Sequence, residues 1–216
     1  MGREWEQVKL EAWRRLVEDL EIGYLDVDIL DVLVEFFMRP HSFTKSSCSG
    51  RIVVMDADYP WSKDETTIIF KKHDPISIEE LLRILSHSYA SRLWLNLQGP
   101  IYHVYCYGME EALEVLAIAR EAGFKHSGIL VVDGDNILVE LRTGIRLVTL
   151  LADESGPLLS RQALERLVRV ANEMLAYAKR RNKLLLEALR RRRPAKPWRP
   201  PHGLGDWLVF KWGSNA

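Results

Sequence analysis

The sequence has 216 residues, of which 47% are apolar and 28% are charged, and its 30 basic side chains equal its 30 acidic ones in number. This length suits one domain, or two small ones, with a substantial hydrophobic core. No apolar run approaches the roughly 20 residues needed to cross a bilayer, and the charged N-terminal segment lacks a signal-like apolar stretch, so we expect a cytoplasmic protein.

Hydrophobic periodicity predicts helices and strands in the first half of the chain. Helices are expected over residues 6–20, 26–38 and 78–88, and strands over residues 51–55 and 66–71. Asp26 stands at the start of the second helix, where its side chain can serve as an N-cap. Ser77 and Glu80 have the spacing of a capping box, which marks the start of the third helix.

The second half continues the alternation of strands and helices. Strands are expected over residues 93–98, 101–107, 127–132, 137–142 and 146–150, and helices over residues 109–122 and 160–193. Gly99 and Pro100 separate two of these strands and predict a hairpin, as does the turn at residues 133–136. Gly123 is placed to end one helix and Pro194 to stop the last one.

Strands interleaved with helices, some joined by tight turns, predict an α+β fold with a mixed sheet and helices packed on it. A doubly wound nucleotide-binding fold needs a glycine-rich turn after its first strand, and the glycines at 108, 123, 128 and 134 are isolated. A Rossmann fold is therefore not expected. We expect residues 1–193 to form a single domain, and residues 194–216 to form a proline-rich arm with basic and aromatic side chains.

Charge is distributed unevenly along the chain. Residues 1–178 contain 19 lysines and arginines against 28 aspartates and glutamates, whereas residues 179–216 contain 11 against 2. Such asymmetry indicates a polyanionic partner, and a nucleic acid bound through its phosphates fits a basic tail of this kind. The alternative is that the basic end complements its own helix dipole and lies against the acidic body.

The two cysteines, Cys48 and Cys106, are too few for a disulfide framework in a chain of this size. Their separation in the sequence does not fit a paired zinc-ligand spacing either. We therefore expect both to be reduced thiols and predict no metal site.

A run of small side chains followed by a guanidinium is the most informative motif: Ser46, Ser47, Cys48, Ser49, Gly50 and Arg51. It lies between a helix-like apolar segment and a strand-like one, where we expect a loop that turns backbone N–H groups and hydroxyls toward a ligand. Such a loop favours an anion. The alternative is an ordinary serine-rich connection whose hydroxyls satisfy nearby backbone amides.

Together with Phe43 and Thr44, this run resembles the signature of the tRNA wybutosine-synthesising protein 3 family. Further matching positions follow in the family's order: Asp19, Gly23, Asp26, His73, residues 101–106, residues 119–129, residues 141–143 and residues 171–172. The resemblance covers residues 9–185 and therefore most of the chain.

The resemblance implies an enzyme that transfers a methyl group from S-adenosyl-L-methionine to N-4 of the tricyclic guanine derivative beside the anticodon of phenylalanine tRNA. It also implies two structurally related halves that contribute to one barrel-like sheet. The tRNA is then the expected partner, through its anticodon loop, and we expect a monomer with residues 1–193 as its catalytic domain. Because methyl transfer from a sulfonium is an in-line displacement, the protein mainly holds donor and acceptor at reacting distance.

Asp26 and His73 are the expected catalytic residues, because both match family positions. The acceptor nitrogen must lose a proton, and a carboxylate or an imidazole beside it can take that proton. For Asp26 the alternative is a structural role as the helix N-cap.

The residues expected to bind the cofactor are those of the serine-rich run and five others: Ser46, Ser47, Cys48, Ser49, Gly50, Arg51, His103, Ser127, Gly128, Arg142 and Asn172. Arg51 and Arg142 can grip a carboxylate or phosphate with two hydrogen bonds, although arginines also form surface salt bridges. The apolar strand around His103 also suits a satisfied core histidine. Asn172 can instead cap a neighbouring loop.

The RNA is expected to be held by stacking and by charge. Tyr59, Trp61 and Phe124 are candidate rings for stacking on the modified base. The basic helix over residues 179–193 and the arm that follows it would then lie along the anticodon stem.

Two other functions stay open: a non-catalytic RNA-binding or scaffold protein that uses the same basic tail, and a thiol-dependent hydrolase with Cys48 as its nucleophile. Binding of the cofactor separates the first from a methyltransferase. The sequence around Cys48 matches no cysteine hydrolase signature, so we expect Cys48→Ala to retain methylation and Arg51→Ala to lose most of it.

Overall fold

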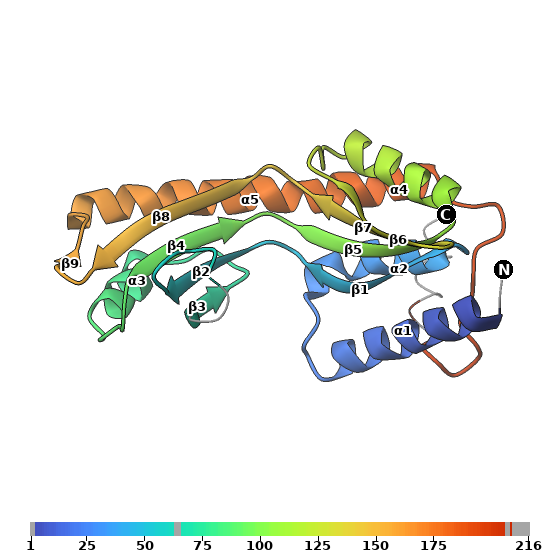
Figure 1. Cartoon of the computed structure of the whole chain (residues 1–216), viewed down its shortest axis with the longest axis horizontal. Helices are drawn as coiled ribbons and strands as arrows, with labels where there is room; N and C mark the ends of the chain where they lie inside the picture. Colours follow the sequence, from blue (N-terminus) through green and yellow to red (C-terminus); the bar gives the residue numbers. More distant parts are fainter. Residues whose placement is uncertain (1–2, 63–65, 206–207, 209–216) are drawn as a thin grey trace. The chain divides into compact units, whose positions relative to one another are not determined.

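The computed structural model describes residues 3–62, 66–205 and 208, which form two compact units (Figure 1). Unit 1 takes its residues from 1–49, 100–143 and 181–216, and unit 2 from 50–99 and 144–180. The chain passes between the units after Ser49, Gly99, Thr143 and Arg180. Each unit has a hydrophobic core of its own.

Unit 1 is a four-stranded antiparallel sheet with helices packed on it. Its strands lie in the order β1 (Ser42–Cys48), β5 (Ile101–Tyr107), β7 (Asn136–Arg142) and β6 (Gly128–Asp133). Its helices are α1 (Arg3–Glu21), η1 (Val27–Ile29), α2 (Leu30–Met38), α4 (Met109–Glu121) and the last part of α5 (Arg161–Arg191). Along β5, Tyr102, Val104 and Cys106 are buried in the core, whereas the residues between them are half-exposed, as expected for alternating side chains.

Unit 2 is a five-stranded antiparallel sheet. Its strands lie in the order β3 (Thr67–Lys72), β2 (Arg51–Asp56), β4 (Leu93–Gln98), β8 (Arg146–Asp153) and β9 (Gly156–Pro157). Helix α3 (Ile78–Leu85) and the first part of α5 complete the core of this unit. Ile52, Leu95 and Leu97 of the sheet are buried there with Leu81 of α3 and Ala171 of α5.

The predicted α+β class is confirmed, and the fold is not of the Rossmann type. All described strand pairs are antiparallel, and the strands form two open sheets where the resemblance implied one barrel-like sheet. The predicted capping box is confirmed, because the Ser77 hydroxyl accepts the N–H of Glu80 while the Glu80 carboxylate accepts the N–H of Ser77. Among the described residues, no helix combines the length and apolar character that a membrane span needs.

The hairpin predicted at Gly99 and Pro100 is wrong. Strand β4 pairs with β2 and β8 in unit 2, whereas β5 pairs with β1 and β7 in unit 1. Gly99 N–H donates to the Ile145 carbonyl at 3.0 Å and so does not close a turn. Both strands have partners that are distant in the sequence, and a local turn pattern carries no information about them. The second predicted hairpin is confirmed, with Asp133 opposite Asn136.

The serine-rich run is mostly strand, so the prediction of a loop is wrong for its first half. Three of its residues pair with β5, in the register Ser46 to His103, Ser47 to Tyr102 and Cys48 to Ile101. The connection to β2 consists of Ser49 and Gly50, and Gly50 adopts a φ of 101°, which favours glycine. Backbone pairing across the sheet therefore satisfies part of the run that we expected to face a ligand.

The predicted helix from Asp26 begins differently from expectation. Residues Val27–Ile29 form a short 3-10 turn, α2 starts at Leu30, and the Asp26 side chain makes no capping hydrogen bond. The N-cap role considered for Asp26 is therefore wrong.

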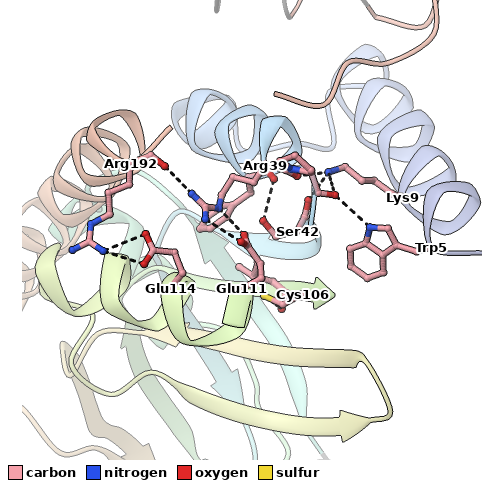
Figure 2. A network of polar contacts seen from close by, with 11 residues as sticks. Trp5, Lys9, Arg39, Ser42, Cys106, Glu111, Glu114 and Arg192 are labelled. Atoms are coloured by element: carbon pink, nitrogen blue, oxygen red, sulfur yellow. Dashed lines mark hydrogen bonds and ion pairs between the residues drawn. The ribbon is translucent and has the colours of Figure 1, made fainter. Parts of the chain in front are cut away.

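A buried polar network joins α1, α2, α4 and the end of α5 within unit 1 (Figure 2). Arg39 donates to the two carboxylate oxygens of Glu111 at 2.6 and 3.0 Å and to the Arg192 carbonyl at 2.9 Å. Lys9 of α1 donates to the carbonyls of Arg39, Pro40 and Ser42. The network ties the first and last helices of the chain to the same unit.

Four arginines at the end of α5 and just after it are paired with carboxylates of unit 1. They form ion pairs in the following combinations: Arg190 with Asp31 and Glu35, Arg191 with Glu121, Arg192 with Glu114 and Glu121, and Arg193 with Glu35. For these four residues, the alternative that the basic tail lies against the acidic body is confirmed. Contact of this end of the helix with the anticodon stem stays a prediction.

The beginning of the predicted arm is packed on unit 1. Trp198 N–H donates to the Met38 carbonyl at 2.8 Å, and its ring lies 5.8 Å from Trp13 and 6.5 Å from Phe37. Trp13 in turn donates its indole N–H to the Leu204 carbonyl at 2.6 Å. Most of the aromatic end of the arm, residues 206–207 and 209–216, lies outside the described residues.

Candidate functional site

Asp26 holds the residue that follows β1. Its Oδ2 accepts the N–H of Ser49 at 2.8 Å, and a carboxylate oxygen lies within 4.8 Å of Cys48 Sγ. Ser49 is fully buried. The Asp26 carboxylate was expected to satisfy a backbone N–H at the start of a helix. It instead satisfies the backbone N–H of Ser49 in the serine-rich run.

A second support reaches the same residue from helix α5. The Ser49 carbonyl accepts the side-chain N–H of Asn182 at 3.1 Å, and the side-chain oxygen of Asn182, Oδ1, accepts the Tyr102 hydroxyl at 2.8 Å. Burial raises the pKa of Tyr102 well above its usual range, and acidic groups such as Asp28 add to the rise, so the hydroxyl stays protonated and donates. Both backbone polar groups of Ser49 are thus fixed by side chains, the half-buried Asp26 and the buried Asn182.

Polar residues cross the half-exposed face of the sheet in unit 1. Ser46, His103, Glu140 and Gly128 are successive neighbours in the register of the four strands. His103 Nε2 lies 3.3 Å from a Glu140 carboxylate oxygen, and the histidine side chain is 32% exposed. The core-histidine alternative is therefore wrong, and this row places an imidazole and a carboxylate where a ligand can reach them.

Arg142 and Ser127 meet at the end of β7, but through the backbone. Ser127 Oγ accepts the N–H of Arg142 at 3.0 Å and donates to the Phe124 carbonyl at 2.7 Å. The Arg142 guanidinium lies 3.9 Å from Glu140 with its side chain 38% exposed, which is the surface ion pair considered as an alternative. Ser127 therefore fixes the turn after α4, and Arg142 is the residue of this pair that can reach a ligand.

In unit 2, His73 and Gly50 lie together. His73 Nδ1 is 3.2 Å from the Gly50 carbonyl. Because a carbonyl oxygen only accepts, Nδ1 carries the proton, and Nε2 is then the basic nitrogen of the neutral ring. The next residue, Arg51, is half-buried, and within the described part of the chain its guanidinium has neither an ion pair nor a hydrogen bond.

Asn172 does not belong with these residues. Its side-chain oxygen accepts the N–H of Ile76 at 2.9 Å, and its side-chain nitrogen donates to the carbonyl of the same residue at 2.8 Å. Asn172 therefore caps a neighbouring loop, which is the alternative considered for it. Both the oxygen and the nitrogen of its side-chain amide are engaged in these bonds. The structure gives no support to Asn172 as a cofactor ligand.

Sequence reasoning missed three residues of the candidate site: Tyr102, Glu140 and Asn182. Asn182 lies in a run of lysines and arginines, and the predictions made for that run rest only on its charge. Helical spacing is the signal that could have found it, because Ala178, Asn182, Leu185 and Leu189 share one face of α5 and are all buried. An amide on a buried helical face must bond to something, and here it bonds to Ser49.

An open pocket of about 450 Å³ lies in unit 2 between the start of β8 and α5. Its walls include Arg146, Met174, Tyr177 and Arg180. None of the residues predicted to bind the cofactor lines it, so the pocket does not support those predictions.

Comparison with known proteins identifies the class of protein. The family model of methyltransferase TYW3 matches residues 7–191, and the chain therefore belongs to this methyltransferase family. A curated relative from Saccharolobus solfataricus is 46% identical over 186 residues, which are 86% of this chain and 89% of the relative. That relative is named tRNA(Phe) 7-((3-amino-3-carboxypropyl)-4-demethylwyosine(37)-N(4))-methyltransferase. A second relative, from Pyrococcus abyssi, has the same name followed by the number 1. It is 32% identical over 185 residues, which are 86% of this chain and 95% of the relative.

Two solved structures share the fold. The PH1069 protein from Pyrococcus horikoshii has a TM-score of 0.80 at 30% identity and matches 85% of this chain and 95% of its own. A hypothetical protein from Aeropyrum pernix has a TM-score of 0.67 at 27% identity and matches 76% of this chain and 96% of its own.

Proposed function

We propose that the chain transfers a methyl group from S-adenosyl-L-methionine to N-4 of the tricyclic wybutosine precursor base next to the anticodon of phenylalanine tRNA. The observation that carries the proposal is the 46% identity to a relative named for this reaction over 86% of the chain. The chemical character of particular residues in each unit adds support to the proposal.

The residues present fit the cofactor. Ser47 Oγ is buried and has no hydrogen-bond partner among the described residues, and an orphaned hydroxyl of this kind calls for a ligand atom. The Arg51 guanidinium suits the carboxylate of the methionine part of the cofactor. When bound, the cofactor supplies an electrophilic methyl group on a sulfonium. Arg142, Ser46 and His103 stay in the proposal as further contacts.

His73 is proposed as the general base. Its Nδ1 proton is directed to the Gly50 carbonyl, so Nε2 is the nitrogen that can accept a proton from the substrate. Asp26 enters the proposal as a positioning residue, because its Oδ2 already accepts the N–H of Ser49.

Two further points belong to the proposal. The enzyme acts as a monomer in the cytoplasm, as the sequence predicts. Cys48 and Cys106 are not joined to each other, which suits a reducing compartment.

The proposal is tested by labelled methyl transfer to tRNA extracted from cells that lack this protein. We expect transfer to a single modified base, and His73→Gln should lower the rate by about 10²–10⁴-fold, the usual contribution of a general base. His87→Gln is the matched control, since His87 Nδ1 also contacts a backbone carbonyl, that of Arg83, at the end of α3. Equal loss in both variants would count against His73.

Cofactor binding is measured separately by calorimetry on the purified protein. Arg51→Met should weaken S-adenosyl-methionine binding by at least about tenfold, as expected for a charged hydrogen bond. Arg83→Met, an exposed arginine of α3, serves as the control. Absence of any cofactor binding, even with tRNA present, would replace the enzyme by a non-catalytic RNA-binding protein.

A further inference from the structure

Three side chains form a layered stack on the surface of unit 2. The Tyr59 and Trp61 rings are parallel, with centroids 5.1 Å apart and an interplanar angle of 14°. The Arg92 guanidinium lies over the Tyr59 ring at 5.5 Å. Tyr59 is 48% exposed and Trp61 is 72% exposed, so the ring at the end of the stack is the one most open to solvent.

The backbone beneath the stack is held by hydrogen bonds. The Asp56 carboxylate, which is buried, accepts the N–H groups of Ala90 at 2.5 Å and Ser91 at 2.9 Å. Ala57 N–H donates to the Arg92 carbonyl at 3.0 Å. These bonds join the segment after β2 to the segment before β4.

Arg92 of the stack and the neighbouring Trp94 are tied to the same framework. The Arg92 guanidinium donates to the Asp58 carbonyl at 3.1 Å, and the Trp94 indole N–H donates to the Ala57 carbonyl at 3.0 Å. The Tyr59 ring contacts both the held Arg92 guanidinium and the Trp61 ring, so a base that stacks there meets rings that already contact each other, and less side-chain freedom is lost on binding.

The chemistry of the stack fits one kind of partner. Exposed aromatic rings offer flat faces on which any nucleobase can stack, and an adjacent arginine adds positive charge near the phosphates. A single tryptophan at the surface needs no explanation, but a parallel pair of rings beside a guanidinium offers the kind of surface on which unpaired bases of single-stranded RNA stack.

We propose that the outer face of Trp61 stacks on an unpaired base of the RNA substrate, with Tyr59 and Arg92 as the layers behind it. This inference rests on the proposed function, because it assumes that the substrate is an RNA with an unpaired loop. Phe124, the third ring that the sequence suggested for stacking, is fully buried in unit 1 and that suggestion is wrong.

The test measures binding of single-stranded oligoadenylate and oligouridylate of equal length to the full-length protein, by fluorescence anisotropy. Trp61→Ala should weaken oligoadenylate binding by about tenfold, since one stacked base contributes on this scale. Trp61→Phe should retain most of the affinity, because it keeps an aromatic face. Oligoadenylate should bind more tightly than oligouridylate to the unchanged protein, as purines stack more strongly, and Trp61→Ala should narrow that difference.

Tyr24→Ala is the matched control, because Tyr24 is 74% exposed in unit 1 and has no ring contact within the described residues. The affinity of Tyr24→Ala for oligoadenylate should equal that of the unchanged protein. The salt dependence of binding should also be the same for Trp61→Ala and the unchanged protein, since stacking does not alter the number of phosphate contacts. A change in the salt slope would indicate lost phosphate contacts and overturn the stacking role.

The inference is overturned if the unchanged protein does not bind oligoadenylate, if Trp61→Ala binds it equally well, or if Tyr24→Ala loses as much affinity. Failure of the proposed function looks different. In that case the tRNA is not methylated and the cofactor is not bound, while oligoadenylate binding still depends on Trp61.

Discussion

The two units differ in where they keep their polar groups. Nine polar or charged residues of the described part are buried, and eight of them lie in unit 1: Lys9, Glu35, Arg39, Ser42, Thr44, Ser49, Thr143 and Asn182. In unit 2 the one described member of this class is Asp56. Unit 1 therefore contains most of the buried charges and buried polar groups, whereas unit 2 has an apolar core with most polar groups near water.

This difference separates structural support from ligand contact. In unit 1, Asp26 and Asn182 are committed to the backbone of Ser49. In unit 2, the Arg51 guanidinium has no ion pair or hydrogen bond within the described residues, and the Trp61 ring is 72% exposed. Substitutions of buried polar residues in unit 1 should therefore change stability, and those of exposed groups in unit 2 should change binding.

The largest effect on stability is expected for Arg39→Ala. This change removes a guanidinium that is 8% exposed and leaves the Glu111 carboxylate, 12% exposed, without its partner. The free energy of unfolding should fall by about 3–5 kcal/mol, as for other broken buried ion pairs. Urea denaturation measures it.

The comparison in unit 2 is Lys72→Ala, which breaks a partly exposed pair with Glu80 whose side chains are 34% and 28% exposed. Here the expected loss is at most about 1 kcal/mol, because water screens the pair. Similar losses for Arg39→Ala and Lys72→Ala would remove the contrast between the units.

The next effect is a pH dependence that arises from Lys9. Burial lowers the pKa of Lys9 from its usual 10.5 to about 7, although Glu6 and Glu111 act to raise it. Between these two values the unfolded chain binds a proton that the folded chain does not, so stability should rise with pH, by at most about 1.4 kcal/mol per pH unit. Below pH 7 Lys9 is protonated in both the folded and the unfolded state, so it no longer makes stability depend on pH.

Urea denaturation at pH 7, 8 and 9 checks this dependence. Lys9→Met is the comparison, because it keeps the length of the side chain and cannot titrate. The rise between pH 7 and 9 should be smaller in the variant. An identical pH dependence in both proteins would show that Lys9 keeps its proton when folded.

A smaller effect is expected for Asn182→Ala. The Tyr102 hydroxyl and the Ser49 carbonyl would both lose a buried partner, at a cost of about 1–3 kcal/mol. Asn172→Ala in unit 2 removes two part-buried bonds to Ile76 and should cost less, about 1 kcal/mol. Thermal unfolding of both variants gives the ranking, and a greater loss for Asn172→Ala would reverse it.

Local patterns predicted the elements well and their partners poorly. The capping box at Ser77 and the stop at Gly123 depend on neighbours in the sequence, and both are present, with Gly123 at a φ of 85°. The strands around Gly99 were also predicted at the right residues. Their pairing was not, because it is decided by strands that lie far along the chain.

The same limit explains the candidate site. The family resemblance pointed to Asp26 and to the serine-rich run, and the structure does bring Asp26 to Ser49. The role assigned to Asp26 as a helix cap came from its position before an apolar helix, and the actual partner is 23 residues away. Glu140 and Asn182 belong to no sequence motif. They enter the candidate site because the folded chain brings them to His103, Tyr102 and Ser49, which are distant in the sequence.

The discontinuous make-up of the units has a consequence for synthesis on the ribosome. Unit 2 is complete once residue 180 has emerged, whereas unit 1 still lacks the end of α5 and Trp198, over whose ring the Lys9 ammonium lies at 4.9 Å. Lys9 of the N-terminal helix can therefore contact Trp198 only after nearly the whole polypeptide has been synthesised. We expect nascent chains released early to contain a folded unit 2 beside an unfinished unit 1, a state that is prone to aggregation and dependent on chaperones.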